Sequence, residues 1–264
     1  MTGGGQRDLS SDVWRGANLV RAYDTSGLRP VEAKLFARYR AELSGRVLEI
    51  GCGGGRLTRE LCTFGGEVHA IDISPVMVRH TRELCPGATV VVGDLRDLSN
   101  YADGFFDVLF GPFNVLDVLD DAERNLALDE WRRVISADGL LIMSSHNRAY
   151  DPRVVGPGRQ LLANIRALKS RSTAGSIVRM PRRVSNHRRL RKLERTEPGY
   201  AILNDDAHDH SMLHYYIYRD DQARQLADHG FELIECLDLD GEPVEAGEAA
   251  AASPELHYVA RPGD

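Results

Sequence analysis

A short apolar run followed directly by a glycine-rich turn constrains the fold of this chain more than any other feature. The run is Val47–Ile50, the turn spans residues 51–55 with four glycines and one cysteine, and a helical pattern follows from Arg56 to Phe64. Glycine permits positive φ and lets a backbone lie close against a ligand. Strand, tight turn and helix in this order predict the first unit of an α/β fold, with a ligand site at the turn.

The same alternation continues along the chain. Further strands are predicted at residues 68–72, 89–92, 106–110, 140–144, 214–218, 231–238 and 255–260, and helices at 74–84, 122–134 and 220–229. Strands joined through crossover helices pair in parallel, so we predict a doubly wound, mostly parallel α/β sheet. The last two strands have no helix between them, which predicts an antiparallel hairpin at the sheet edge with residues 245–253 in its loop.

Composition limits the class of protein. A chain of 264 residues with 42% hydrophobic content can bury one core and an appended subdomain without metal or disulfides. Residues 1–15 lack an apolar leader, and no run of about 18 apolar residues could span a bilayer, so we expect a cytoplasmic protein without membrane contact. The cysteines show neither paired nor zinc-type spacing and are expected to be reduced: Cys52, Cys62, Cys85 and Cys236.

Charge divides the chain unevenly. Residues 148–200 contain 14 basic against 3 acidic side chains, which leaves 19 against 36 in the rest. This segregation predicts a basic surface on an acidic body. With the predicted elements it suggests four parts, namely an N-terminal helical region or lid (1–44), a cofactor-binding core (45–146), an inserted helical and basic acceptor-binding subdomain (147–213), and a completion of the sheet (214–264).

Acidic residues stand at the ends of three successive predicted strands. Glu49 lies beside the glycine turn, Asp72 stands 21 positions after Gly51, and Asp94 ends the third strand. A dinucleotide site would have glycine where this chain has Arg56, and a carboxylate at Glu49 would repel a pyrophosphate. Asp72 is spaced to accept both hydroxyls of a ribose, although either aspartate could instead be a turn former or helix cap. The pattern favours a positively charged nucleoside.

These motifs resemble the class I S-adenosylmethionine-dependent methyltransferases of the small-molecule type over residues 41–145. The family's first-strand motif stands here as Glu49, Gly51, Gly53 and Gly55. The resemblance implies S-adenosylmethionine as cofactor and a seven-stranded sheet whose last strand is antiparallel. It also implies a set of cofactor-binding residues: Tyr23, Glu49, Gly51, Cys52, Gly53, Gly55, Asp72, Ile73, Asp94, Leu95, Gly111, Pro112 and Asn114.

Each part of that set has a role in the family. The resemblance implies that Glu49 and the loop hold the methionine moiety, Asp72 the ribose, and Asp94 with Leu95 the adenine. The segment 111–114 would form the floor near the methyl group. Tyr23 would cover the cofactor, unless it is an ordinary core aromatic.

Histidines are the candidates for acceptor chemistry. Methyl transfer to oxygen or nitrogen is a direct displacement that can require a base, and histidine titrates near neutrality. We expect His214 to be that base, followed by His146, with Tyr215 as a further catalytic candidate and hydrogen-bonded structural histidine as the alternative. His208, His210 and Asp205 have metal-ligand residue types, but their spacing favours a solvated polar loop, so no metal is expected.

The sequence therefore predicts a methyltransferase for an O or N atom of a small molecule, such as a natural product, a sugar or another anionic or glycosidic metabolite. An RNA methyltransferase that uses the basic insert is the enzyme alternative. Base-stacking aromatics are missing from residues 179–195, which makes nucleic acid the weaker hypothesis. A cofactor-binding module without chemistry is the third possibility, and the oligomeric state is left open.

Overall fold

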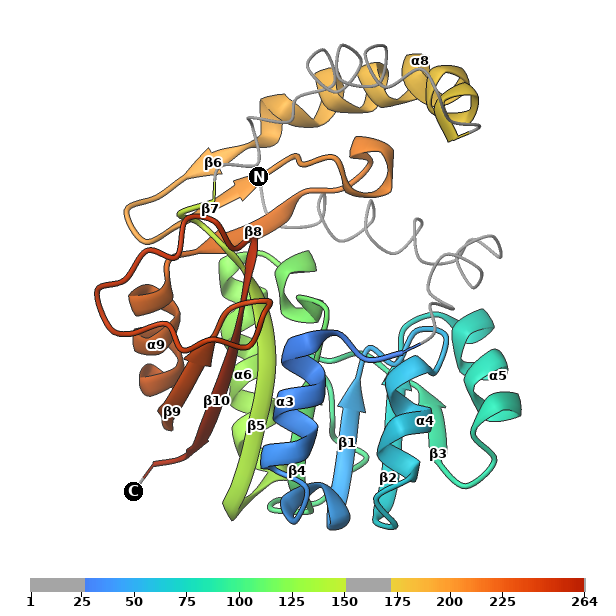
Figure 1. Ribbon diagram of the computed structural model, residues 1–264, viewed down its shortest axis with the longest axis vertical. Helices are drawn as coiled ribbons and strands as arrows, with labels where there is room; N and C mark the ends of the chain where they lie inside the picture. The colour runs from blue at the N-terminus through green and yellow to red at the C-terminus, as the bar shows by residue number, and fades with distance from the viewer. Residues whose placement is uncertain (1–26, 151–171, 264) are drawn as a thin grey trace.

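The computed structural model describes residues 27–150 and 172–263, with side chains left out for residues 172–180. A central sheet carries helices on both faces, and a helical arm lies beyond one end of it (Figure 1). The strands and helices of the first half are α3 (Pro30–Arg38), β1 (Arg46–Ile50), α4 (Arg56–Cys62), β2 (Glu67–Asp72), α5 (Pro75–Leu84), β3 (Thr89–Val92), β4 (Phe106–Gly111), α6 (Asp121–Val134) and β5 (Ile135–Asn147). The second half contains α8 (Ser172–Leu190), β6 (Arg195–Thr196), β7 (Tyr200–Leu203), β8 (His214–Ile217), α9 (Arg219–Asp228), β9 (Phe231–Leu237) and β10 (Glu255–Pro262).

The doubly wound, mostly parallel sheet predicted from the sequence is confirmed. Strands run in the order β3-β2-β1-β4-β5, and each neighbouring pair is parallel. β10 pairs antiparallel with β5 and with β9, so the predicted C-terminal hairpin is present, with β9 as its outer strand. Because all the parallel strands point the same way, their carboxyl ends meet along one edge of the sheet.

The expectation of seven strands was too low, since ten strands form the sheet in the described residues. β5 extends to Asn147, beyond the predicted end at residue 144, and its last two residues pair in parallel with β8. β7 and β6 continue antiparallel from β8. The segment expected to be a helical insert therefore contributes strands as well. β6 and β7 have only two and four residues, too short for a clear alternating pattern.

Alternating side chains of the strands build one apolar core on each face of the sheet. Leu48 and Leu141 pack with Trp131 of α6 on one face. Their sequence neighbours Val47 and Leu140 pack on the other face, in a cluster that includes residues of α3 and α4. This period of two is what a strand covered on both faces requires.

Local signals fix the ends of two helices near the site. Pro75 occupies the first position of α5, where its fixed φ suits a helix start, and Ser74 precedes it without a side-chain cap hydrogen bond. The Asp120 side chain accepts a hydrogen bond from the main-chain N–H of Glu123, and the Glu123 side chain closes a capping box at the start of α6. All four cysteines are free thiols, as expected. No helix within the described ranges is both long and apolar enough to cross a bilayer.

Candidate active site

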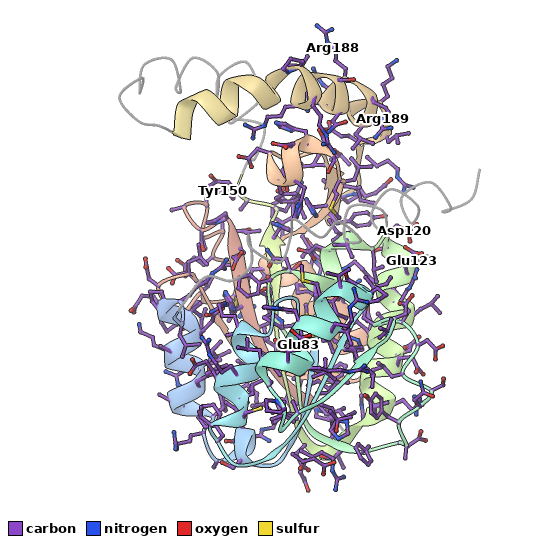
Figure 2. The ribbon with its side chains drawn as sticks, turned by 90° about the vertical axis from the view of Figure 1, so that its right-hand side faces the viewer. Glu83, Asp120, Glu123, Tyr150, Arg188 and Arg189 are labelled. Carbon is purple, nitrogen blue, oxygen red and sulfur yellow. The ribbon has the colours of Figure 1, made fainter. Side chains whose placement is uncertain are left out.

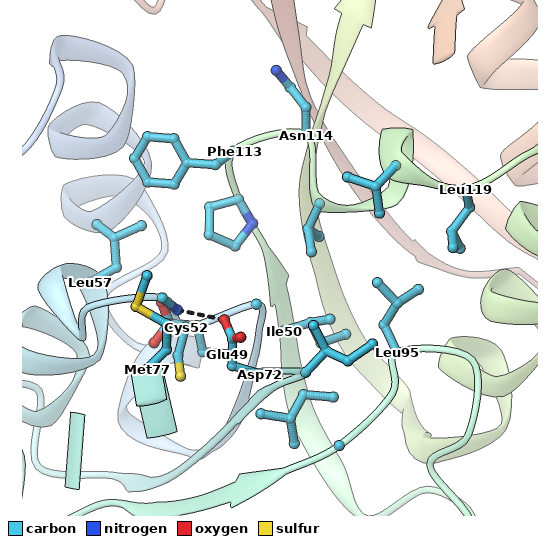
Figure 3. A pocket seen from close by; sticks show the side chains of 18 of the residues that line it. Glu49, Ile50, Cys52, Leu57, Asp72, Met77, Leu95, Phe113, Asn114 and Leu119 are labelled. Atoms are coloured by element: carbon cyan, nitrogen blue, oxygen red, sulfur yellow. Dashed lines mark hydrogen bonds between the residues drawn. The ribbon is translucent and has the colours of Figure 1, made fainter. Parts of the chain in front are cut away.

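One pocket opens at the carboxyl ends of β1 to β4, with a cavity volume of about 760 Å³ (Figure 3). Its walls include most of the predicted site: Glu49, Gly51, Cys52, Gly53, Asp72, Ile73, Asp94, Leu95, Pro112, Asn114, His146 and His214. Gly55, Gly111 and Tyr215 are not among its lining residues. Tyr23 and residues 1–26 lie outside the described residues.

The turn after β1 requires glycine because three of its residues have positive φ. Gly51, Gly53 and Gly55 have φ of 77°, 52° and 80°, a region that glycine adopts without steric cost. A Cβ at Gly51 would stand 2.6 Å from a Val115 methyl, whereas a Cβ at Gly53 would meet nothing within 4 Å. The Gly53 backbone therefore faces open space on the pocket side, which suits close approach of a ligand.

Two predicted glycines serve packing and not the pocket. Gly55 ends the turn in the left-handed conformation at the start of α4, and a Cβ there would stand 3.0 Å from the Thr81 side chain. A Cβ at Gly111 would approach the Trp131 ring to 2.9 Å. Both positions need glycine because a neighbouring side chain fills the space. The sequence motif cannot distinguish that need from ligand contact.

Glu49 and Cys52 are buried at the base of the pocket. The Thr58 hydroxyl donates a hydrogen bond of 2.5 Å to the Glu49 carboxylate. Burial nevertheless raises the pKa of Glu49 to about 8, because a charged carboxylate is poorly solvated there. Burial also raises the pKa of the Cys52 thiol, so Cys52 is not a thiolate nucleophile. A bound cation would compensate the Glu49 charge.

Asp72 has a fixed carboxylate at the end of β2. Its Oδ2 accepts from the Gly53 N–H at 2.9 Å (Figure 3), and its Oδ1 accepts from the Ser74 N–H at 2.8 Å. Burial raises its pKa. The bond to Ser74 is the turn-forming role considered above, and the side chain also lines the pocket. Each carboxylate oxygen can accept more than one hydrogen bond, so both roles are compatible.

The end of β3 combines charge with apolar surface. Asp94 accepts from the main-chain N–H of Arg96 at 3.0 Å and from its Nε at 2.8 Å, and Arg96 also pairs with Glu123. Ile73 keeps 43% of its surface exposed although it lines the pocket. Ile73 and Leu95 thus offer apolar contact for a flat ring, beside an anchored carboxylate.

The backbone of the segment after β4 is strained. Phe113 and Asn114 both have φ of 54°, which is costly for residues other than glycine. The Asn114 N–H donates to Ser144 Oγ at 2.8 Å, and its side-chain amide donates to Glu255 at 3.1 Å. Its Oδ1 is buried and has no hydrogen-bond partner in the described part of the chain. A buried acceptor without a donor at the pocket wall indicates a ligand contact.

Two arginines lie over the ring of Phe113. The guanidinium carbon is 4.3 Å from the ring centre for Arg29 and 4.7 Å for Arg56. Arg56 makes two hydrogen bonds to Glu32 of α3, at 2.7 and 2.8 Å, and both side chains are buried. Arg29 pairs with Glu255 at 2.6 Å. The sequence reading missed Arg29 and Glu255, which are 226 positions apart and carry no local motif.

Two aspartate–histidine pairs stand on the opposite side of the pocket. Asp117 Oδ2 lies 2.7 Å from His146 Nδ1, and Asp205 Oδ2 lies 2.8 Å from His214 Nδ1. The two imidazole rings are 5.2 Å apart. Burial alone would lower the pKa of His146, but the hydrogen bond and charge of Asp117 outweigh it and raise that pKa. The structure therefore brings both predicted bases together, each with a carboxylate on one ring nitrogen.

Tyr215 points away from them. Alternate residues of a strand face opposite sides, so His214 and Tyr216 share one face of β8 and Tyr215 lies on the other. The Tyr215 hydroxyl donates to Asp121 at 2.6 Å, and its ring lies 4.2 Å from the Arg124 guanidinium. Tyr216 instead donates to Asp205 at 2.7 Å. The structure does not bring Tyr215 to the pocket.

The polar loop before β8 is strained and contributes one further histidine. His208, Asp209 and His210 have φ of 50°, 58° and 57°. His208 lines the pocket, whereas His210 is buried outside its lining. Asp205 is bound to His214, so the three metal-type residues do not converge. In residues 27–150 and 172–263 no group of three or more His, Cys, Asp or Glu side chains could hold a metal ion.

Comparison with known proteins agrees with this geometry. Residues 47–139 match a family described as a methyltransferase domain. Within this range the chain is similar to methyltransferase domains. The chain is 30% identical over 137 residues to the ubiquinone biosynthesis O-methyltransferase of Xanthomonas campestris pv. campestris, covering 49% of this chain and 56% of that protein. It thus spans about half the length of the curated relatives it matches.

Solved structures share the methyltransferase fold over nearly the whole chain. A 1,6-didemethyltoxoflavin-N1-methyltransferase from Burkholderia thailandensis has a TM-score of 0.60 at 14% identity, covering 100% of this chain and 93% of that one. The glycopeptide N-methyltransferase MtfA, solved with S-adenosyl-L-methionine, has a TM-score of 0.55 at 18% identity, covering 90% of this chain and 95% of that one. Identities this low establish a shared fold only. The predicted fold is thereby confirmed.

Proposed function

We propose that this protein transfers a methyl group from S-adenosylmethionine to an oxygen or nitrogen atom of a small molecule. One observation carries the proposal. A single pocket is lined by acidic residues at three strand ends and, across from them, by two histidines that each hold a carboxylate on one ring nitrogen. A cationic nucleoside and a nucleophile that must lose a proton can therefore meet in one cavity.

The residues present fit the cofactor. Glu49 and the open Gly53 backbone would hold its amino acid part, where a cationic amino group compensates the buried carboxylate. Asp72 would accept the ribose hydroxyls, and Asp94 with Ile73 would hold the adenine. When bound, S-adenosylmethionine supplies an electrophilic methyl group. The unpartnered Asn114 Oδ1 would receive a ligand donor at the same wall.

His146 is our first candidate for the base. Its Nδ1 is held by Asp117, which leaves Nε2 for the acceptor, and its side chain keeps 19% of its surface exposed. A neutral imidazole in this orientation can take a proton from an acceptor hydroxyl or amine. His214, held in the same way by Asp205, is the second candidate.

The size of the pocket and the names of the similar proteins both support a small acceptor. A cavity of about 760 Å³ lies within the range typical of small-molecule sites. The named relatives act in ubiquinone biosynthesis or on didemethyltoxoflavin, and both names denote small-molecule chemistry. The insert contributes Ala207 and His208 to the pocket, and His214 follows it directly at the start of β8, so we assign residues 147–213 to acceptor binding.

Isothermal titration with S-adenosylmethionine tests the cofactor, and incubation of a metabolite pool with labelled methyl donor tests turnover. We expect saturable binding by the full chain, loss of most of that binding in Asp72→Ala, and label in a small-molecule fraction. A folded protein that binds no cofactor would overturn the proposal. Binding without transfer to any metabolite would instead favour an inert cofactor-binding module.

One observation favours RNA as an alternative acceptor. Arg188, Arg189, Arg191, Lys192 and Arg195 are exposed, and Arg188 and Arg189 lie on the arm beyond the sheet (Figure 2). Tyr200, the nearest aromatic, is stacked on Tyr215 with ring centres 4.6 Å apart and is not free to stack a base. RNA retention that weakens steeply with salt, together with labelled RNA, would support this alternative.

A further inference from the structure

Asp117 is a fully buried carboxylate beside the candidate base His146. Building on the proposed function, we propose that Asp117 is the positioning residue of His146, and that Arg124 behind it balances the Asp117 charge. Neither side chain lines the pocket. Both have no exposed surface.

Asp117 contacts both the main chain and the ring of His146. Its Oδ2 accepts from the His146 main-chain N–H at 2.6 Å and lies 2.7 Å from His146 Nδ1. Its Oδ1 accepts from the Ser145 hydroxyl at 2.7 Å and from Arg124 at 2.5 Å. Contacts to both the backbone and the ring of His146 fix the rotamer of the imidazole. They also keep the ring proton on Nδ1, so that Nε2 can accept a proton.

The position of Asp117 makes this grip part of the pocket. Asp117 lies in the short helix Val115–Val118, directly after the strained Phe113–Asn114 segment that lines the wall. His146 lies near the end of β5. The aspartate therefore ties the segment expected to lie near the reacting methyl group to the strand that carries the base. A displacement of either element would change the distance between donor and base.

Arg124 is placed to balance the negative charge of Asp117. It extends from α6, and its Nη2 donates to Gln222 at 2.7 Å and to Gln225 at 3.2 Å, both on α9. Its Nε is buried without a hydrogen-bond partner among the described residues. The Tyr215 ring lies against its guanidinium at 4.2 Å. An uncompensated carboxylate beside His146 would hold the ring in its charged form, which cannot act as a base. Arg124 offsets part of that charge and keeps the Asp117 carboxylate ionised.

Other charged and titratable groups also act on His146. Asp205 and Glu255 both raise its pKa, although less than Asp117 does. The rings of His214 and Tyr216 stand 5.2 and 4.8 Å from it. Of the three carboxylates, Asp117 alone has a hydrogen bond to the His146 ring among the described residues. Its replacement should therefore have the largest effect on the ring.

The test is a nitrogen-15 NMR titration of the His146 ring in the full chain without ligand, compared between Asp117→Asn and Arg124→Met. Asp117→Asn removes a negative charge, so the midpoint of His146 should fall by about one pH unit or more. Arg124→Met removes the balancing positive charge, so the midpoint should rise. Shifts in opposite directions are not expected from a structural role alone.

Kinetics provide a second readout. In Asp117→Asn, kcat should fall by about 100-fold, with cofactor affinity within twofold of wild type. In Arg124→Met, the acidic limb of the kcat/KM profile should move to higher pH.

Two control variants apply to the NMR titration. Ser145→Ala removes a neutral donor to the same carboxylate and should leave the His146 midpoint nearly unchanged. Asp205→Asn, the matched control on the second pair, should lower the His146 midpoint less than Asp117→Asn does.

Arg124→Lys covers the case in which Arg124→Met does not fold. It keeps the charge and should give a smaller upward shift of the His146 midpoint. An unchanged His146 titration in Asp117→Asn would overturn the positioning role. The proposed function fails separately, if the wild-type protein neither binds S-adenosylmethionine nor transfers label.

Discussion

The two sides of the pocket differ in how the chain builds them. The cofactor side comes from consecutive strand ends, and Asp72 bonds to a backbone group only 19 positions away. The proposed acceptor side joins His146, which is bonded to a residue 29 positions away, with His214 of β8, a strand that follows the inserted segment. The proposed donor side is thus encoded locally, whereas the proposed acceptor side depends on the completed fold.

The sharpest test of this division is His146→Gln. Loss of the base should lower kcat by about 10²–10⁴-fold, since general-base catalysis typically contributes that much. Cofactor affinity, measured by isothermal titration, should stay within twofold of wild type because His146 lies across the pocket from the glycine turn. A parallel loss of cofactor binding would contradict the division into two sides.

The converse test is Asp72→Ala. Loss of a fixed carboxylate that accepts two ribose hydroxyls should weaken S-adenosylmethionine binding by about 100-fold, because hydrogen bonds to charged groups contribute roughly 1.5–3 kcal/mol each. Titration calorimetry measures the affinity. Asp72→Asn keeps the shape and should lose less. Unaltered binding in Asp72→Ala would show that the ribose is held elsewhere.

The pH dependence of cofactor binding tests Glu49. Its pKa is raised to about 8 by burial, so at pH 6 the empty site is mainly protonated. A cationic ligand favours the ionised carboxylate, so affinity should increase as pH rises from 6 toward 8, by at most about tenfold per unit, with release of a proton. Titrations in buffers of different ionisation enthalpy measure that proton. Glu49→Gln should bind more weakly and lose this pH dependence.

The smallest effect is expected on the basic arm. Arg188→Glu combined with Arg189→Glu changes exposed charge on α8, so activity on a small acceptor should change less than twofold at physiological salt. The assay is label transfer to the small-molecule fraction at two salt concentrations. A large loss of label transfer that affects only RNA would indicate that the acceptor is a nucleic acid bound at this surface and not a small molecule in the pocket.

The sequence predicted the strand ends and helices around the glycine turn well because their signals are local. β3 and α5 begin and end within a residue of the predicted bounds, and the strand-end acids reach one pocket. Gly55 and Gly111 have the same sequence signature as Gly53, but their environment is a packed side chain, which only tertiary structure reveals.

The acceptor side was harder to predict for a related reason. The histidines were visible by residue type, but Asp117 lies 29 positions from His146, and Arg29 lies 226 positions from Glu255, without a motif in either case. Asp205 is only nine positions from His214, but residue type alone does not show that the two side chains pair. Tyr215 and Tyr216 are adjacent and chemically alike, and only the register of β8 decides which one faces Asp205. β6, with two residues, is too short to recognise from its pattern.

The junction between β5 and β8 has a consequence for engineering. The main-chain ladder joins them at only two residue pairs, His146 with Tyr216 and Asn147 with Ile217. The segment between them also supplies β7, which pairs with β8 at four residue pairs, and Asp205, which bonds to His214. We therefore expect a grafted segment to redirect the acceptor specificity only if it brings its own strand to lie beside β8 and its own carboxylate to hold His214.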